Sequence, residues 1–313
     1  MRPTHFLLTC SFGVAFLACS HDEMAEGTST DALTSHTGSR ASLDGGRRDS
    51  SARDSGTTTS STDGWVLTWS DEFDLANGSA VDGTKWAHEV GGSGWGNNER
   101  EYYTDGTTNS VIRDGTLVIT ATRDGASQYS CWYGTCEYTS ARLNTKGKFT
   151  QTHGRLAARI KIPSGQGLWP AFWMLGDNID TSEGQWPACG EIDIMENIGS
   201  EASIVHATIH GTGYSGSSGI SASYTLSNGA RFQGDFHVFA TEWETNNIRF
   251  YVDDTLYATR TPSDLPSGGV WAFEHPFYLL LNVAVGGDWP KSPDSTTVFP
   301  QTMTVDWVRV YAR

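Results

Sequence analysis

Apolar and polar residues alternate with a period of two along most of the chain after residue 63. The alternating runs are short, turns rich in Gly, Asn, Asp and Ser separate them, and no long run has a helical period. The clearest strand-like runs are Leu117–Ala121, Arg155–Ile162, Ile204–Ile209, Val238–Trp243, Ile248–Val252, Tyr278–Val285 and Thr304–Tyr311. We therefore expect residues 64–313 to form one all-β domain, a sandwich of two antiparallel sheets.

One strand-like segment, Gly190–Asn197, alternates acidic with aliphatic residues. Under strict alternation Glu191 and Asp193 share one face, whereas Glu196 turns into the core. Burying an unpaired carboxylate there is costly. A β-bulge near Met195 adds one residue to the strand and returns Glu196 to the acidic face, so we predict a bulge at this point.

Three carboxylates on one face of a strand repel one another. At least one of them is therefore expected to keep its proton near neutral pH. Glycosidases use this arrangement, with an ionised nucleophile and a protonated general acid on either side of one bond. An acid-rich edge strand or a row of calcium ligands gives a similar pattern, so the surrounding sequence has to separate these interpretations.

Two tryptophan-rich segments precede the acidic strand, GQGLWPAFWML at residues 165–175 and QWPACG at residues 185–190. Together with the strand they closely resemble glycoside hydrolase family 16, in particular its laminarinase (endo-β-1,3-glucanase) branch. The resemblance extends over residues 65–311. It implies a β-jelly roll whose concave sheet forms the substrate cleft, and hydrolysis of internal β-1,3-glucosidic bonds with retention of configuration.

The resemblance also assigns roles to the three acids. Glu191 corresponds to the nucleophile, Glu196 to the general acid and base, and Asp193 to a residue that tunes the charge of the pair. Two alternatives stay open, a β-1,3-1,4-glucanase with lichenase-like specificity and a non-catalytic β-glucan-binding jelly roll. The extra residue Met195 favours the laminarinase branch, and the presence of all three acids favours an enzyme.

Further cleft residues follow from the same resemblance, and several of them have another interpretation. Asn98 can be a turn residue, Arg142 can pair with an acid of the cleft, and Trp173 can belong to the core. Near them, Glu101 stands where the family more usually has Gln. The predicted contacts with β-glucan are Trp95, Asn98, Arg142, Trp169, Trp173, Trp186, His210, Asn282 and Trp289.

No cofactor is expected for catalysis, but many members of the family bind a structural calcium ion. By analogy its ligands would be Glu72, the carbonyl group of Gly115 and Asp306, oxygen donors of the kind that calcium prefers. Cys131 and Cys136 flank a short loop and are expected to form a disulfide in an exported protein. This pairing leaves Cys189 as a buried free thiol.

The N-terminus has the pattern of an export signal. Residues 1–19 contain an apolar run that is too short for a membrane anchor, and Cys19 resembles the lipidated residue of a bacterial lipobox. Residues 20–63 are rich in Ser, Thr and Asp and are expected to be a disordered linker. These features predict an outer-membrane or cell-surface lipoprotein, with secretion as the alternative.

The formal net charge of −15 argues against nucleic acid as a partner. It also argues against membrane contact other than through the lipid anchor. A neutral β-glucan polysaccharide is compatible with this charge, and the 12 tryptophans suit a sugar cleft. We expect the protein to be a monomer.

Overall fold

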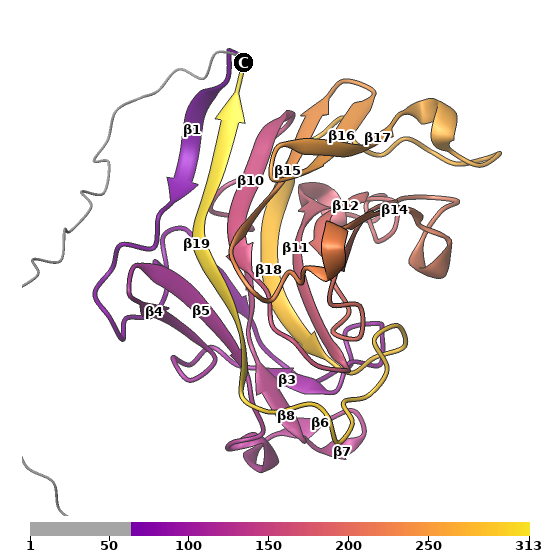
Figure 1. Ribbon diagram of the computed structural model, residues 1–313. Helices are drawn as coiled ribbons and strands as arrows, with labels where there is room; N and C mark the ends of the chain where they lie inside the picture. The colour runs from indigo at the N-terminus through magenta and orange to yellow at the C-terminus, as the bar shows by residue number, and fades with distance from the viewer. Residues whose placement is uncertain (1–63) are drawn as a thin grey trace, which may run out of the picture. The chain divides into compact units, whose positions relative to one another are not determined.

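The structure, a computed structural model, describes residues 64–313. The predicted signal peptide (residues 1–19), the lipidation site Cys19 and the linker (residues 20–63) lie outside the described residues. In the described part the chain folds into antiparallel sheets with a few short 3-10 turns (Figure 1). None of its helices is long and apolar enough to cross a membrane.

The first sheet is built around the long strand β19. On one side β19 pairs with β10, and on the other side with β1 near its C-terminal end and with β5 near its N-terminal end. The order is β17-β16-β15-β10-β19-β5-β4, with β1 beside β19. Its strands are β1 (Val66–Asp71), β4 (Ser110–Arg113), β5 (Thr116–Ala121), β10 (Gly154–Lys161), β15 (His237–Glu244), β16 (Asn247–Val252), β17 (Thr255–Arg260) and β19 (Gln301–Ala312).

The second sheet has the order β14-β13-β12-β11-β18-β9-β2 and carries the acidic strand β12 near its middle. All its neighbouring strands are antiparallel. Its strands are β2 (Ala87–Glu89), β9 (Arg142–Asn144), β11 (Leu168–Gly176), β12 (Glu191–Glu196), β13 (Ile204–His210), β14 (Ile220–Thr225) and β18 (Phe277–Val285).

Two small strand pairs lie outside these sheets. The parallel pair is β3 (Glu101–Tyr103) with β8 (Tyr138–Ser140), and the hairpin is β6 (Ser130–Cys131) with β7 (Gly134–Thr135). The 3-10 turns are η1 (Ala126–Gln128), η2 (Asp177–Asp180), η3 (Gly216–Ser218), η4 (Ser227–Gly229) and η5 (Pro262–Asp264).

The core lies between the two sheets, where alternate residues of each strand meet. Phe172 and Met174 of β11 are fully buried there against residues of the first sheet such as Leu156. The residues that alternate with them along β11 belong to a second, smaller apolar cluster on the opposite face of the sheet. These residues are Ala171, Trp173 and Leu175. Burial on both faces makes β11 a rigid support for the residues that it carries.

The predicted fold class is confirmed, two antiparallel sheets packed as in a β-jelly roll. Each predicted strand lies at its expected place, and the ends differ by one to three residues, as for Thr304–Tyr311 within β19. Period-two alternation was sufficient here because each strand has one face in the core and one face outside it.

Candidate active site

The acidic strand β12 has the predicted bulge. In its pairing with β11, Asp193 lies opposite Trp173 and Met195 lies opposite the adjacent Phe172. Ile194 has no partner on β11 and is therefore the additional residue. Ile194 and Met195 are both buried in the core between the sheets. The bulge therefore absorbs one apolar residue and leaves Glu196 free to face the indole of Trp169, outside the core.

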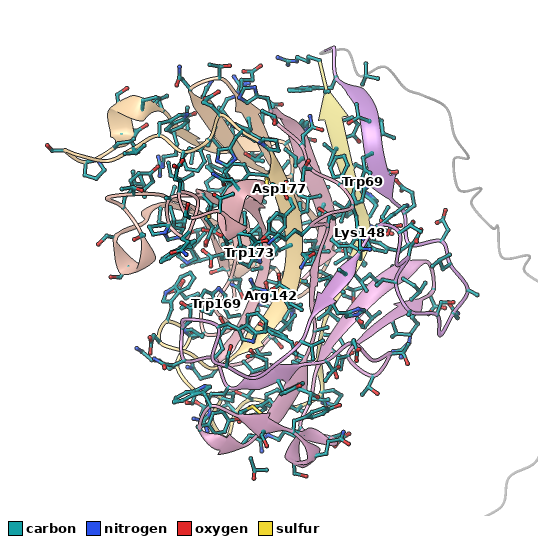
Figure 2. The ribbon with its side chains drawn as sticks, turned by 180° about the vertical axis from the view of Figure 1, so that it is seen from behind. Trp69, Arg142, Lys148, Trp169, Trp173 and Asp177 are labelled. Atoms are coloured by element: carbon teal, nitrogen blue, oxygen red, sulfur yellow. A yellow bond between two sulfur atoms is a disulfide. The ribbon has the colours of Figure 1, made fainter. Side chains whose placement is uncertain are left out.

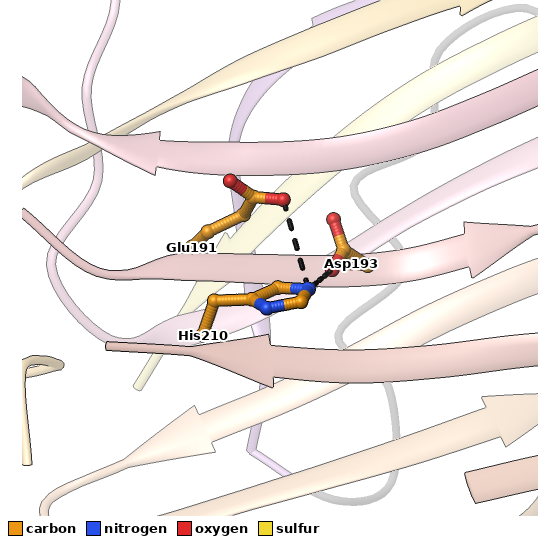
Figure 3. A group of neighbouring side chains, drawn as sticks. All are labelled: Glu191, Asp193 and His210. Carbon is orange, nitrogen blue, oxygen red and sulfur yellow. Dashed lines mark ion pairs between the residues drawn. The ribbon is translucent and has the colours of Figure 1, made fainter. Parts of the chain in front are cut away.

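His210 of the neighbouring strand β13 completes an acidic cluster with Glu191, Asp193 and Glu196. Figure 3 shows three of its members, Glu191, Asp193 and His210. His210 Nε2 lies 3.2 Å from Asp193 Oδ2 and 3.9 Å from Glu191 Oε1. Its Nδ1 is buried and has no hydrogen-bond partner among residues 64–313. A proton on Nδ1 would therefore lack an acceptor, whereas a proton on Nε2 points toward the acids.

The three acids of this cluster have raised pKa values. Burial, and then the charge of Asp193, raises the pKa of Glu191 to about 8. Burial raises the pKa of Asp193 to about 7. Burial and the charge of Asp193 also raise the pKa of Glu196 well above its usual value. This agrees with the expectation that at least one acid stays protonated, as a general acid must be.

Each glutamate of the cluster accepts a hydrogen bond from a tryptophan. Trp186 Nε1 donates to Glu191 Oε2 over 2.7 Å, and Trp169 Nε1 donates to Glu196 Oε1 over 3.0 Å. Both bonds stabilise the ionised carboxylate and lower its pKa. The Trp186 side chain is 45% exposed, so the residue that holds the carboxylate also offers an open aromatic surface.

A second group of predicted cleft residues, which we call the floor, is connected by side-chain contacts and consists of Trp95, Arg142, Trp173 and Asn282. Figure 2 labels Arg142 and Trp173 among them. The Arg142 guanidinium lies between the rings of Trp95 and Trp173, 4.8 Å and 4.7 Å from their centroids. It also forms an ion pair with Glu89. Trp173 Nε1 donates a 2.7 Å hydrogen bond to Asn282 Oδ1, so Trp173 supports the cleft side and not the core between the sheets.

Trp289 and Asn98 lie beside this floor and contact other cleft residues. The Trp289 ring packs edge-on against Trp169 and His206, with centroids 5.4 Å and 5.1 Å apart. Asn98 donates hydrogen bonds of 3.0 Å and 3.1 Å to both carboxylate oxygens of Asp288. Asn98 also has a positive φ of 57° and lies in a turn, which supports its interpretation as a turn residue.

Both cysteine predictions are confirmed within the described residues. Cys131 and Cys136 form a disulfide that closes the β6–β7 hairpin. Cys189 is a buried free thiol. Burial raises the pKa of this thiol to about 11, so it stays protonated and unreactive at neutral pH.

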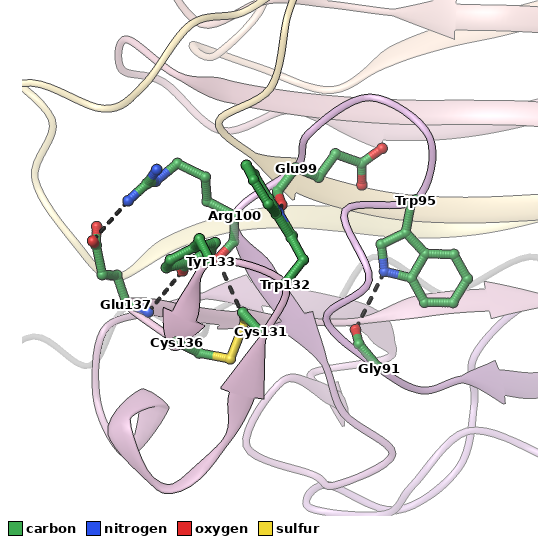
Figure 4. Close-up of a disulfide and its surroundings, with 9 residues drawn as sticks. All are labelled: Gly91, Trp95, Glu99, Arg100, Cys131, Trp132, Tyr133, Cys136 and Glu137. Carbon is green, nitrogen blue, oxygen red and sulfur yellow. Dashed lines mark hydrogen bonds and ion pairs between the residues drawn. A yellow bond between two sulfur atoms is a disulfide. The ribbon is translucent and has the colours of Figure 1, made fainter. Parts of the chain in front are cut away.

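The β6–β7 hairpin with its disulfide holds residues 95–104, the segment predicted to form the cleft rim (Figure 4). Trp132 Nε1 donates a 2.7 Å hydrogen bond to the carbonyl oxygen of Glu99. The Tyr133 hydroxyl donates a 2.5 Å hydrogen bond to the carbonyl oxygen of Arg100. Two consecutive peptide groups of the rim are thus fixed by one disulfide-bridged loop.

The two carboxylates predicted to bind calcium both form ion pairs with arginines in the structure. The Glu72 carboxylate accepts two hydrogen bonds from Arg309, and Asp306 pairs with Arg159 at 2.7 Å. Gly115 lies in the turn between β4 and β5. Their oxygens suit calcium, but each carboxylate already neutralises an arginine, so calcium binding stays a prediction. Within residues 64–313, the group with metal-ligand spacing belongs to the acidic cluster, where three members have ligand atoms within 4.8 Å.

Sequence reasoning missed several partners of these residues. Tyr103, whose hydroxyl lies 3.3 Å from Asn282 Nδ2, was not predicted, and neither were Glu89 and Asp288. For Tyr103 a signal was available, because the buried Asn282 amide needs hydrogen-bond partners and the rim segment offers two tyrosines.

Comparisons with known proteins agree with this geometry. The family model for glycosyl hydrolases family 16 matches residues 97–309. A β-glucanase from Rhodothermus marinus is 41% identical over 254 residues, which cover 79% of this chain and 85% of that protein.

Two solved structures are similar in sequence and fold. The catalytic domain of an endo-1,3-β-glucanase (laminarinase) from Thermotoga petrophila is 46% identical, with a TM-score of 0.73, and the match covers 79% of this chain and 98% of that one. The endo-β-1,3-glucanase from Pyrococcus furiosus is 49% identical with a TM-score of 0.73, over 79% and 94% of the two chains. The protein described here therefore belongs to the glycosyl hydrolases family 16.

Proposed function

We propose that this protein hydrolyses internal β-1,3-glucosidic bonds of laminarin-type β-glucans with retention of configuration. The observation that carries the proposal is the bulged strand β12, which presents Glu191 and Glu196 with Asp193 between them. Each glutamate has its own tryptophan N–H donor. Relatives named as β-1,3-glucanases support the choice of substrate.

In the first step Glu191 attacks the anomeric carbon while Glu196 gives its proton to the leaving glycosidic oxygen. In the second step Glu196 takes a proton from water, and this water breaks the bond between the sugar and Glu191. The raised pKa of Glu196 keeps the proton available for the first step. The charge of Asp193 raises the pKa of the neighbouring Glu191. A proton on Asp193 therefore favours the ionised form of Glu191.

The cleft floor supplies flat apolar surfaces beside hydrogen-bonding groups. Sugar rings have apolar faces that stack on indole rings, and their hydroxyl groups need polar partners. Trp186 and Trp169 offer such surfaces next to Glu191 and Glu196, respectively. Arg142 and Asn282 are held by aromatic neighbours at the floor and offer the polar contacts.

The test is to incubate the purified protein with laminarin, lichenan and agarose and to resolve the products by chromatography. We expect oligosaccharides from laminarin, much slower release from lichenan and none from agarose. Glu191→Ala should nearly abolish this activity, whereas Glu201→Gln, at an acid outside the cluster that pairs with His206, should keep it. Release of glucose alone from the outset, or faster cleavage of lichenan, would contradict the proposal.

We further propose that the protein is exported and anchored through Cys19. The support is the apolar segment before this cysteine and the disulfide between Cys131 and Cys136, which fits an oxidising compartment. Cys19→Ala should move the protein from the membrane fraction to the soluble fraction. Equal distribution of the two proteins would exclude lipidation at this residue.

A further inference from the structure

A second pair of acids lies buried beneath the cleft rim, apart from the acidic cluster. Glu99 is 3% exposed and Glu101 is not exposed at all. They are two positions apart where the chain enters β3, and the charge of Glu99 acts on the Glu101 carboxyl group. Two ionised carboxylates buried this close together repel each other, so one proton held between them is favoured.

The hydrogen bonds around the pair indicate which carboxyl oxygen carries this proton. Glu101 Oε2 accepts a 2.6 Å hydrogen bond from the backbone N–H of Val285. Glu101 Oε1 is buried and has no donor among the described residues. Glu99 accepts from Asn97 Nδ2 through one oxygen and from the Tyr103 hydroxyl through the other, both over 3.0 Å. A proton on Glu101 Oε1, directed at Glu99, gives a hydrogen bond to the one carboxyl oxygen of this pair that otherwise lacks a partner.

The charged groups near Glu99 and Glu101 do not neutralise two negative charges. The cation next to it is Arg142, and Arg142 already forms an ion pair with Glu89. Tyr103 is neutral, because burial and the two glutamates raise its pKa well above its usual value. Burial and the charge of Glu99 likewise raise the pKa of Glu101 well above its usual value. With a single proton the pair carries one negative charge.

The pair is connected to the cleft floor through hydrogen bonds. The Tyr103 hydroxyl donates to Glu99 and accepts from Asn282 Nδ2 over 3.3 Å. Asn282 Oδ1 in turn accepts the 2.7 Å hydrogen bond from Trp173 Nε1. Because Glu99 fixes the direction of the Tyr103 proton, it also fixes which side of the Asn282 amide faces Tyr103 and which faces Trp173.

We propose that Glu99 and Glu101 share one proton and that this pair positions Tyr103, Asn282 and Trp173 for sugar binding. The role in sugar binding depends on the proposed function, whereas the shared proton does not. Glu99 and Glu101 are positioning residues, because they act through Tyr103 and not on the substrate itself. Sugar binding should therefore weaken at high pH, when the pair loses its proton and two buried like charges repel each other.

Substitutions at Glu101 distinguish the effect of the shared proton from the effect of the side chain's size. Glu101→Gln keeps an oxygen for the Val285 N–H and supplies an N–H to Glu99 that cannot titrate. Glu101→Leu keeps a similar volume but has no donor. Glu137→Gln is the control, since Glu137 is a more exposed acid nearby that pairs with Arg100.

The proton is tested without any substrate, by infrared spectroscopy at about pH 8, where an ordinary glutamate is ionised. The difference between wild type and Glu101→Gln should show the loss of a protonated carboxyl band, and Glu137→Gln should not. The melting temperature should also fall less between about pH 6 and 9 in Glu101→Gln than in wild type. No band difference together with the same pH dependence of melting would overturn the shared proton.

The positioning role is tested by kinetics on laminarin. Glu101→Leu should raise KM about tenfold with kcat nearly unchanged, since one hydrogen-bonded link to the floor is lost. Glu101→Gln should keep the wild-type KM at neutral pH and should not show the rise in KM at high pH. An unchanged KM in Glu101→Leu would overturn the positioning role. If laminarin is not cleaved at all, the proposed function fails while the infrared result still decides the proton.

Discussion

Trp186 Nε1 lies 2.7 Å from Glu191 Oε2 and donates a hydrogen bond to it, although the tryptophan belongs to the loop before the strand and not to the sheet. This bond lowers the pKa of Glu191 against the effects of burial and of the charge of Asp193. The corresponding bond on Glu196 comes from Trp169 of β11. The two carboxyl groups are therefore tuned by separate elements of the fold.

Replacing each tryptophan by phenylalanine should shift a different limb of the pH–rate profile. Trp186→Phe removes the donor to Glu191, raises its pKa and moves the acidic limb of kcat/KM to higher pH. Trp169→Phe raises the pKa of Glu196 and moves the alkaline limb to higher pH. Each variant should lose about tenfold in kcat/KM near the wild-type optimum. Profiles that keep the wild-type limbs would show that the indole N–H groups do not tune the acids.

Azide should distinguish the roles of the two glutamates. With an aryl laminari-oligosaccharide that has a good leaving group, Glu196→Ala should give a burst of phenol and then slow turnover, because the base for deglycosylation is missing. Added azide should accelerate this turnover and yield the β-glycosyl azide. Glu191→Ala should show no burst and should yield the α-anomer. Opposite anomers would mean that the two roles are exchanged.

The free energy of unfolding should fall as the pH rises. The pKa of Glu191 is about 8 in the folded protein and about 4.3 in an unfolded chain, so the folded state binds the additional proton between these values. The stabilisation present at low pH is lost as the pH rises through this window. Wild type should thus lose several degrees of melting temperature between about pH 5 and 8. Glu191→Gln should lose clearly less, and equal losses would contradict the raised pKa.

Removal of the disulfide should weaken substrate binding more than catalysis. In Cys131→Ser/Cys136→Ser the hairpin loses its covalent closure, and Trp132 and Tyr133 hold the rim carbonyl groups less firmly. We expect KM for laminarin to rise severalfold, while kcat stays within about twofold because the acidic cluster lies on other strands. Cys189→Ser serves as the control for loss of a thiol. A fall in kcat with unchanged KM would show that the hairpin does not act through the rim.

Calcium should raise the melting temperature if Glu72, Gly115 and Asp306 can rearrange into a site. The comparison is wild type against Asp306→Asn, with calcium and with a chelator. We expect calcium to stabilise wild type by a few degrees and the variant by less. If calcium changes neither protein, the carboxylates serve only the ion pairs with Arg309 and Arg159 that the structure contains.

Several features of this protein are local and were readable from the sequence. The alternation in residues such as Ile204–Ile209 specified the strands, because one face of each strand must be buried. The cost of burying Glu196 predicted the bulge in β12, and the short spacing of Cys131 and Cys136 predicted their disulfide. These conclusions needed only neighbouring residues and the general cost of burying charge.

Other features depend on strands that are distant in the chain, and only the tertiary structure decided them. Asn98 meets Asp288, 190 positions away, and Asn282 meets Tyr103 across 179 positions. The register between strands determines such pairs, and no local pattern encodes that register across long connections. In the same way, only the structure shows that Asp306, a predicted calcium ligand, forms an ion pair with Arg159 of the neighbouring strand β10.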